Sequence, residues 1–395
     1  MSSVLTIEDI SVEISSGIAC ALSQVVADGV LHLRPFSVTE DGRLVTSDAP
    51  RIPHSAVPPN KMRFEVGDII FNNTNSVELV GKSAVVPTAL EASFSNHMTR
   101  VRIDRRHAEP GYVHAFLRHL YGRRFFQDRA TRWVSQAAFG TSQLKALEVP
   151  LPPLDEQRRI VGLLDRAAEI RRRADAARAK ARAVIPALFL DTFGDPATNP
   201  KGWPVVTLGD LDGMELRNGI SPSKAGKVSG NVLTLSAITR GSFDPSARKQ
   251  AMFAGSLAAE QTVSKSLFLI CRGNGNRALV GQGAFPTADM PGVAFPDTMI
   301  ALRLPEHEVA PQYLAAVWSS DHLRAQVEAA AKTTNGTFKI SQGGILRFSF
   351  PLPPRALQDS FGERVGGLEA VARQLDAAAA KAEAMAAGLS AEVFG

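Results

Sequence analysis

The chain has 395 residues, 44 lysines and arginines against 39 aspartates and glutamates, and a formal net charge of +5. This length excludes a single small module and is enough for two or three domains. No apolar run approaches the roughly 18 residues of a membrane span, and the two cysteines are too few for a disulfide framework or a zinc site. The acidic start does not resemble a signal peptide, so we expect a folded cytoplasmic protein with no membrane partner and no metal.

The first segment, residues 1–153, reads as a globular domain. Short β-like runs at 30–33, 68–71 and 83–86 are separated by Gly, Pro and Asn, and a helix is expected over 112–126. This mixture predicts an α+β domain of mainly antiparallel strands.

A proline-rich element, Pro150-Leu151-Pro152-Pro153, ends this domain, and residues 154–194 read as one long helix. Its apolar and alanine residues alternate in steps of three and four, which is typical of a coiled coil that needs a partner helix. The predicted seam includes Ile160, Ala167, Ile170, Ala174 and Ala177.

The whole pattern then repeats. The PLPP element at 150 recurs at 351, and Phe193-Gly194 recurs as Phe394-Gly395, both 201 residues later. We therefore predict a second α+β domain at 195–353 and a second helix at 354–395. The seam expected on that helix includes Leu368, Val371, Leu375, Ala378 and Met385.

The fold class predicted from the repeat is α+β: two α+β domains in a pseudo-twofold repeat, separated by two long antiparallel coiled-coil helices. Opposite net charges, +3 on residues 155–192 and −2 on residues 355–395, favour pairing of one helix with the other. The alternative is that each helix packs on its own domain as an amphipathic surface helix.

The sequence contains no catalytic motif that we recognise. It lacks the Asn/Asp-Pro-Pro-Tyr/Phe tetrapeptide of amino-methyltransferases and the GxxxxGK[ST] loop of ATPases. Asp68, Glu78 and Lys82 have the wrong spacing for a nuclease core. We expect a non-catalytic binding protein whose partners perform the chemistry.

The segment from Pro150 to Val161, the long helix after it and the segment from Trp203 to Leu211 together resemble the central conserved region of type I restriction-modification specificity subunits. The resemblance covers the whole chain. The second copy departs from the pattern, because only Gln358 of Arg355-Ala356-Leu357-Gln358 matches Gln157 of the first copy.

The resemblance implies a sequence-specific DNA-binding subunit with two target recognition domains that read a bipartite target with a fixed spacer. Its partners are then double-stranded DNA, two adenine methyltransferase (modification) subunits and possibly restriction subunits. No cofactor is bound directly: S-adenosylmethionine belongs to the methyltransferase, and ATP and Mg to a restriction partner. Glu156, Gln157 and Gln358 are predicted to bind partners. The alternative is a coiled-coil scaffold that does not read DNA sequence.

Several polar clusters are candidates for DNA contact, because Gln and Asn can read adenine while Arg and Lys reach guanine or phosphate. Three arginines, Arg123, Arg124 and Arg132, are interleaved with aromatic residues. An equally weighted alternative to DNA contact is that these arginines are solvated on the surface of a helix. The other candidates lie in two pairs of Gly- or Asn-rich loops. The alternative is that these loops are plain turns without a role in DNA binding. These loop candidates are Thr141, Ser142, Gln143, Lys145, Thr337, Lys339 and Gln342 before the PLPP elements, and Asn73, Asn75, Arg272, Asn274, Asn276 and Arg277.

Overall fold

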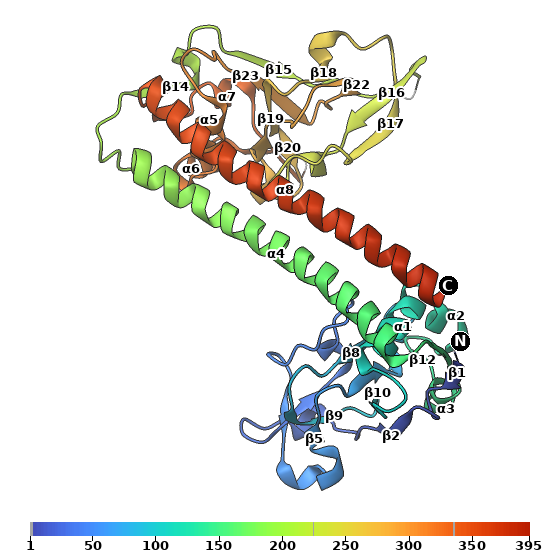
Figure 1. The fold of residues 1–395 in the computed structure, drawn as a ribbon. Helices are drawn as coiled ribbons and strands as arrows, with labels where there is room; N and C mark the ends of the chain where they lie inside the picture. Colours follow the sequence, from blue (N-terminus) through green and yellow to red (C-terminus); the bar gives the residue numbers. More distant parts are fainter. Residues whose placement is uncertain (1–2, 224, 335) are drawn as a thin grey trace. The chain divides into compact units, whose positions relative to one another are not determined.

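The computed structural model describes residues 3–223, 225–334 and 336–395, in two compact units. Unit 1 comprises Met1–Ala174 and Leu375–Gly395, and unit 2 comprises Asp175–Gln374. Each unit thus contains one globular domain and half of each long helix (Figure 1). The compact units divide within the helices, whereas the predicted boundaries at 153, 194 and 353 lie at helix ends.

The described part of unit 1 contains four small sheets, with strand orders β1-β13, β2-β10-β6-β8, β4-β3-β9-β5 and β11-β12-β7. Three short helices accompany them before the long helix begins. The bounds are β1 Ser3–Thr6, β2 Ser11–Ser16, β3 Val30–Leu33, β4 Arg51–Ile52, β5 Arg63–Phe64, β6 Ile69–Asn72, β7 Thr74–Asn75, β8 Ser83–Val85, β9 Leu90–Phe94, β10 Met98–Ile103, α1 Pro110–Gly122, α2 Phe125–Arg129, β11 Thr131–Arg132, β12 Ala137–Ala138, α3 Thr141–Lys145, β13 Glu148–Leu151 and α4 Leu154–Phe193.

Unit 2 repeats this plan, with strand orders β14-β26, β15-β23-β19-β21, β17-β16-β22-β18 and β20-β25-β24. The matching order of elements confirms the predicted duplication and α+β class. The bounds are β14 Val205–Thr207, β15 Glu215–Asn218, β16 Val228–Leu233, β17 Arg248–Phe253, β18 Thr262–Val263, β19 Leu267–Cys271, β20 Gly273–Asn274, β21 Gly283–Ala284, β22 Met290–Ala294, β23 Met299–Arg303, α5 Pro311–Trp318, α6 Asp321–Ala330, β24 Lys332–Thr334, β25 Thr337–Lys339, α7 Gln342–Ile345, β26 Ser349–Pro351 and α8 Arg355–Phe394.

Two features of the domains differ from the sequence-based expectation. The single helix predicted before each PLPP element is broken in two. In unit 1 Arg124 adopts a left-handed conformation (φ 60°) between α1 and α2. In unit 2 the Ser320 hydroxyl accepts a hydrogen bond from the Leu323 amide and so caps a new helix, α6. The strands are mainly antiparallel, as expected, but β3–β9 and β16–β22 pair in parallel.

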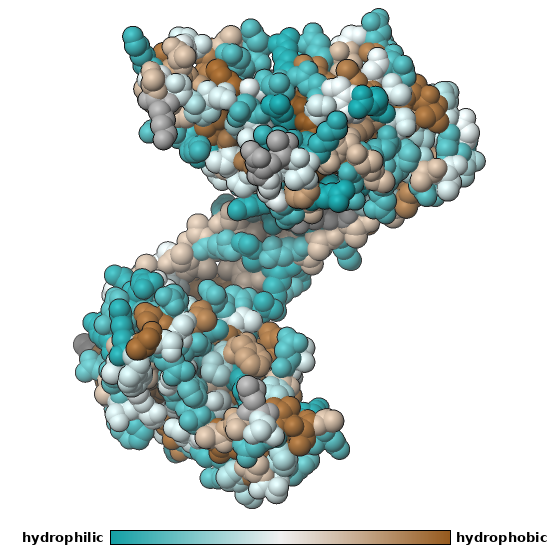
Figure 2. Space-filling view, turned by 180° about the vertical axis from the view of Figure 1, so that it is seen from behind, coloured by the Kyte–Doolittle hydropathy of each residue, from teal (hydrophilic) through white to brown (hydrophobic). Residues whose placement is uncertain are grey.

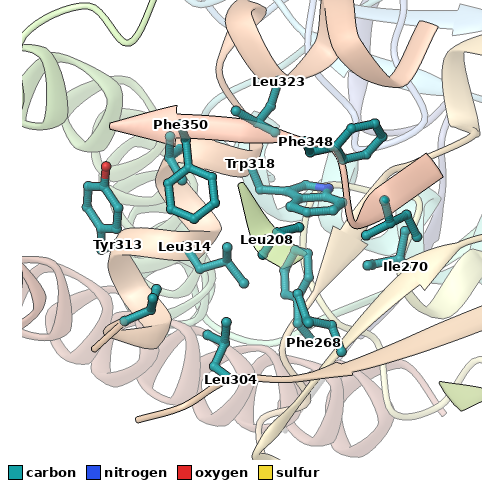
Figure 3. Close-up of a cluster of buried hydrophobic side chains, with 14 of the residues drawn as sticks. Leu208, Phe268, Ile270, Leu304, Tyr313, Leu314, Trp318, Leu323, Phe348 and Phe350 are labelled. Carbon is teal, nitrogen blue, oxygen red and sulfur yellow. The ribbon is translucent and has the colours of Figure 1, made fainter. Parts of the chain in front are cut away.

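Each domain packs against one end of each long helix. In unit 2, α5 and β19 contribute Trp318 and Phe268 to a buried aromatic and aliphatic cluster (Figure 3). Phe193 from the end of α4 lies 4.9 Å from Tyr313 and 5.2 Å from Phe361 of α8, measured between ring centroids. The end of α4 and the start of α8 therefore share one hydrophobic core with the second domain.

Unit 1 has the equivalent arrangement with the helix roles exchanged. Phe394, at the end of α8, lies 5.2 Å from the Tyr112 ring and 5.7 Å from the Phe116 ring. The Tyr112 hydroxyl donates to the Pro150 carbonyl at 2.7 Å, and Tyr313 donates to Pro351 in the same way. The PLPP element, the domain helix and the end of the incoming long helix thus meet at the same point of both units.

A buried glutamine fixes the start of each long helix. The side-chain oxygen of Gln157 accepts from the Glu109 amide at 2.9 Å, and its nitrogen donates to the Pro152 carbonyl at 2.8 Å. Gln358 makes the equivalent bonds to Ala310 and Pro353. Both side chains are fully buried, so the expectation that they bind partners is wrong: they hold the helix to its own domain. Glu156 is partly exposed and pairs with Arg159 at 2.7 Å.

The halves of α4 and α8 pack antiparallel within each unit, as predicted (Figure 1). In unit 1, Arg171 of α4 pairs with Glu383 of α8 at 2.6 Å. The buried seam agrees with the prediction at alternate positions: Ile160 and Ala174 are buried, and Ala167, Leu368 and Leu375 are half-buried.

At most of the remaining predicted seam positions, the buried or half-buried residue is a neighbour of the predicted one. Ile170, Val371 and Met385 are exposed, as is Ala378, while the neighbouring Ala379 is buried. The buried and half-buried positions on α8 include a series with alternating steps of four and three: 361, 365, 368, 372, 375, 379, 382, 386, 389 and 393. Continued back from Leu368 by a step of four, the predicted register falls on Arg364, a break in the apolar pattern. In the structure Arg364 is exposed and the neighbouring Val365 is buried.

We expect Ala174→Glu to lower the free energy of unfolding by about 3 kcal/mol, because it places an unpaired charge at a position that is only 1% exposed. Ala176→Glu, at an exposed position of the same helix, should change it by less than about 0.5 kcal/mol. Denaturant titration of both variants measures the difference, and equal stabilities would show that the helix packing does not exclude water at Ala174.

Candidate nucleic-acid interface

The structure brings together, in each unit, residues that the sequence placed in separate loops. In unit 2, β20 pairs with β25, which pairs with β24, so that Asn274 lies opposite Phe338 and Lys339 lies opposite both Gly273 and Lys332. Unit 1 has the same three-stranded ribbon, in which Asn75 of β7 lies opposite Ala137 of β12. We call these sheets, β11-β12-β7 and β24-β25-β20, the ribbons.

The unit 2 ribbon carries exposed positive charge. Lys332 and Lys339 are exposed, and they lie opposite each other on β24 and β25. Arg277 lies 6.0 Å from the Phe338 ring and donates to the Glu328 carbonyl at 3.1 Å, which orients its guanidinium beside the ribbon. Positive charge on the β24-β25 hairpin of this ribbon suits contact with the phosphates and base edges of DNA.

The adjoining turn holds the remaining unit 2 candidates. Arg272 donates to the Asp297 carbonyl at 3.2 Å. The Asn276 side chain accepts from the Ala278 amide at 3.0 Å, and that of Asn274 accepts from the Asn276 amide at 2.9 Å. Both asparagines therefore shape the turn through their side-chain oxygens, and the Asn274 side chain also forms a hydrogen bond with the Cys271 thiol.

In unit 1, exposed arginines lie in the ribbon and in the chain segment before it, whereas the turn at the tip of the ribbon is apolar. Arg123, Arg124 and Arg132 are exposed, and Arg132 donates to the Gln127 carbonyl at 3.0 Å. The turn between β11 and β12 exposes 58% of Trp133 and all of Val134. Sequence analysis grouped Trp133 with the arginines but did not identify the hairpin.

One candidate is not available to DNA. Asn73 is buried, and its side chain donates to Thr99 Oγ1 at 3.0 Å and to the Asn96 carbonyl at 3.4 Å. Its assignment as a DNA contact is therefore wrong, because its amide is used within the domain. Asn75, two residues later, is half-buried and accepts from the Ser76 amide at 2.8 Å.

The segments before the PLPP elements form short helices, α3 and α7, and not the expected loops. Gln143 is exposed, but its side-chain oxygen accepts from the Gly140 amide at 2.9 Å, and Lys145 pairs with Glu8 at 2.8 Å. Gln342 donates to Asn218 at 3.1 Å. Ser142 is exposed, Thr141 and Thr337 are half-buried, and Asn335 of the second segment lies outside the described residues.

A hairpin signal in the sequence marks the ribbon that we treated as a loop. Asn335-Gly336 lies between Lys332-Thr333-Thr334 and Thr337-Phe338-Lys339, and an Asn-Gly pair between β-prone residues is typical of a tight hairpin. Gly336 has a positive φ of 73°, which the turn requires. That signal would have paired Lys339 with Lys332, which the sequence analysis missed.

The described residues hold no group of three or more His, Cys, Asp or Glu side chains that could bind a metal ion. Burial lowers the pKa of His32 and of His114 to about 4 and raises the pKa of the Cys271 thiol to about 11. At neutral pH the two histidines are therefore uncharged and the thiol is protonated. Over these same residues, no helix has the length and apolar content that a membrane crossing requires.

The face seen in Figure 2 mixes hydrophilic and hydrophobic residues over both units. The two long helices expose apolar side chains at equivalent positions of the repeat. Ile170 and Met385 in unit 1 correspond, 201 residues apart, to Val371 and Val184 in unit 2, and all four are exposed. We call these two pairs the helix patches.

No family model matches the chain. The putative type I restriction enzyme MjaX specificity subunit of Methanocaldococcus jannaschii is 29% identical over 175 residues, which cover 41% of each chain. The type I restriction enzyme EcoKI specificity subunit of Escherichia coli K12 is 24% identical over 391 residues, covering 93% of this chain and 82% of the relative. The StySPI specificity subunit of Salmonella potsdam is 22% identical and covers 85% and 75% of the two chains.

Solved structures share the fold. The S subunit of a type I restriction-modification system from M. genitalium matches with a TM-score of 0.63 at 14% identity, over 100% of this chain and 96% of that one. A chain from a type I system, studied for complex assembly and conformational transition, matches with a TM-score of 0.55 at 18% identity over 100% and 97%.

The duplicated α+β domains and the two long helices form the same fold as the S subunit of a type I restriction-modification system. Over most of its length the chain is similar to the type I restriction-modification specificity subunits.

We expect Asn73→Ala to lower the free energy of unfolding by about 1–3 kcal/mol, because it removes two hydrogen bonds from a buried site. Asn75→Ala should lower it by less than about 0.5 kcal/mol, because that side chain is only half-buried. Thermal and denaturant unfolding of the two variants tests this division; a larger loss in Asn75→Ala would contradict it.

Proposed function

We propose that the chain reads a bipartite DNA sequence, one half with each ribbon, and recruits adenine methyltransferase subunits to it. The observation that carries this proposal is the occurrence of one exposed ribbon in each copy of the repeat, each carrying or flanked by basic and amide side chains. Two strands of each ribbon, β11-β12 and β24-β25, form a hairpin, and a two-stranded hairpin can enter the major groove, where each base pair presents a distinct pattern of donors and acceptors.

The distribution of charge favours DNA binding through local basic clusters over attraction by the net charge of the whole chain. The net charge of +5 is modest for a chain of 395 residues, so phosphate binding must depend on clusters such as Arg123, Arg124 and Arg132 in unit 1. In unit 2 the corresponding groups are Lys332, Lys339 and, beside them, Arg277. These clusters flank groups that can read bases: Asn75 in the first ribbon and Asn274 in the second.

A fixed spacer follows if the two 40-residue helices hold the ribbons at a constant separation. The anchoring supports this: each helix starts at a buried glutamine, and each ends in an aromatic core. Such a rigid link would leave the base pairs between the two half-sites unread, and their number would depend on helix length.

The partners we propose are double-stranded DNA and two modification subunits that use S-adenosylmethionine, with restriction subunits using ATP and Mg in a system that has them. The two helix patches suit two copies of one partner, because repeat-related positions expose apolar side chains in both units. Apolar residues that recur at helical spacing and remain exposed commonly mark a protein-binding surface.

Co-expression with the modification subunit in a methylation-free host, followed by genome-wide mapping of methylated adenines, tests the reading function. We expect a split motif with a fixed gap. Lys339→Ala should relax the motif in the half read by unit 2 alone, with roughly tenfold weaker discrimination, because the lysine lies on one ribbon. Gln143→Ala, in unit 1, provides the reciprocal variant. A stable complex that methylates nothing would instead favour a scaffold that does not read DNA.

A second measurement tests the helix patches. We expect Met385→Glu to reduce the number of bound modification subunits from two to one, because a carboxylate in an apolar contact loses its hydration. Val184→Glu should remove the other subunit. Ala384→Glu, exposed on a different face of α8, is the matched control. Mass photometry of the assembled complex counts the subunits, and two subunits retained in both patch variants would exclude these surfaces.

A further inference from the structure

The tip of the unit 1 ribbon differs in chemistry from the rest of that ribbon. Trp133 is 58% exposed and the adjacent Val134 is fully exposed. Two phenylalanines of the same domain are not exposed: Phe126 and Phe139 are buried, with their ring centroids 5.0 Å apart. The exposure of Trp133 is therefore a property of the tip and not of a loosely packed domain.

The hairpin holds this tip in a defined position. Thr131 pairs with Ala138 and Arg132 with Ala137, and the Trp133 amide donates to the Gln136 carbonyl at 2.7 Å to close the turn. Arg132 is tied to the Gln127 carbonyl of α2. A braced turn presents its side chains with little loss of conformational entropy on binding.

Charge around the tip indicates the kind of partner. Arg123, Arg124, Arg129 and Arg132 are all exposed in the same stretch of chain, against one acid, Asp128. Two exposed apolar side chains beside a stretch of chain with exposed arginines fit a polyanion that also offers an apolar group. Duplex DNA meets both conditions, because its major groove presents the C5-methyl of thymine between two rows of phosphates.

We propose that Trp133 and Val134 form an apolar element that contacts thymine methyl groups in the half-site read by unit 1. This inference rests on the proposed DNA-reading function and names a specificity determinant within it. The equivalent hairpin of unit 2 exposes Lys332, Thr333, Gly336 and Lys339, so its described exposed residues offer polar and basic contacts. Thymine methyl groups therefore contribute to recognition in one half of the target only.

The test uses the whole complex of this chain with its modification subunits and synthetic duplexes that carry the mapped target. Thymines of one half at a time are replaced by deoxyuridine, which lacks only the C5-methyl. We expect deoxyuridine in the unit 1 half to lower kcat/KM for methylation about tenfold, and deoxyuridine in the other half to leave it unchanged.

Variants then assign the methyl contact to the tip. Trp133→Ala should lower the rate on the thymine duplex about tenfold and respond no further to deoxyuridine, as expected of two groups that share one contact. Trp133→Phe should retain part of the discrimination, and Val134→Ala should weaken it. Ser135→Ala, at an exposed position of the same turn, is the matched control and should behave as the wild type.

The outcomes separate this inference from the function on which it rests. A wild-type complex with no split motif would refute the reading function. A split motif whose unit 1 half contains no thymine sensitive to deoxyuridine, or a Trp133→Ala complex that keeps wild-type discrimination, would overturn this inference alone. Failure of Trp133→Ala to assemble with the modification subunits, with unchanged thermal stability, would also overturn it and make the tip a protein contact.

Discussion

The shared core between each domain and two helix ends is the constraint on which the rest of the structure depends. A domain helix supplies Tyr112 or Tyr313, a long helix arriving from elsewhere in the chain supplies Phe394 or Phe193, and a buried glutamine fixes the start of the departing helix. Without the phenylalanine ring from the end of the long helix, each domain would expose the surface around its tyrosine. Each copy of the repeat is therefore completed by the end of the other copy's helix, which explains why the compact units divide within the helices.

The sequence predicted the duplication, the fold class and the antiparallel helices because these depend on patterns spread over many residues. It predicted the seam only in part. Alanines occupy positions on both sides of the seam, at 378 and 379 for example, so hydrophobic spacing alone does not separate neighbouring registers. The presence of Arg364 in the predicted register, beside Val365, was the available sign. The shift matters for function, because it moves Ile170, Val371 and Met385 from the helix interface to the helix patches.

The candidate site was harder to predict because the chain passes from one strand to another at Asn73: β6 ends at Asn72 and β7 begins at Thr74. Asn73 and Asn75 are chemically identical and two residues apart, yet Asn73 points into hydrogen bonds with Thr99 and Asn96 while Asn75 lies on the ribbon. Gln157 and Gln358 were assigned to partners for their resemblance to a family motif, and burial shows that the motif maintains the helix start. A polar residue that recurs in both copies can thus serve packing as well as binding.

The two ribbons share a topology but differ in the chemistry of their exposed side chains. In unit 1, the turn between strands β11 and β12 carries Trp133 and Val134, whereas in unit 2 strands β24 and β25 carry Lys332 and Lys339. A duplicated fold whose buried contacts are the same in both copies can vary its ribbon side chains independently, because those side chains take little part in the cores that join domain to helix. On the proposed function, one architecture would read two different half-sites, with the packing held constant and the sequence preference set at the ribbons.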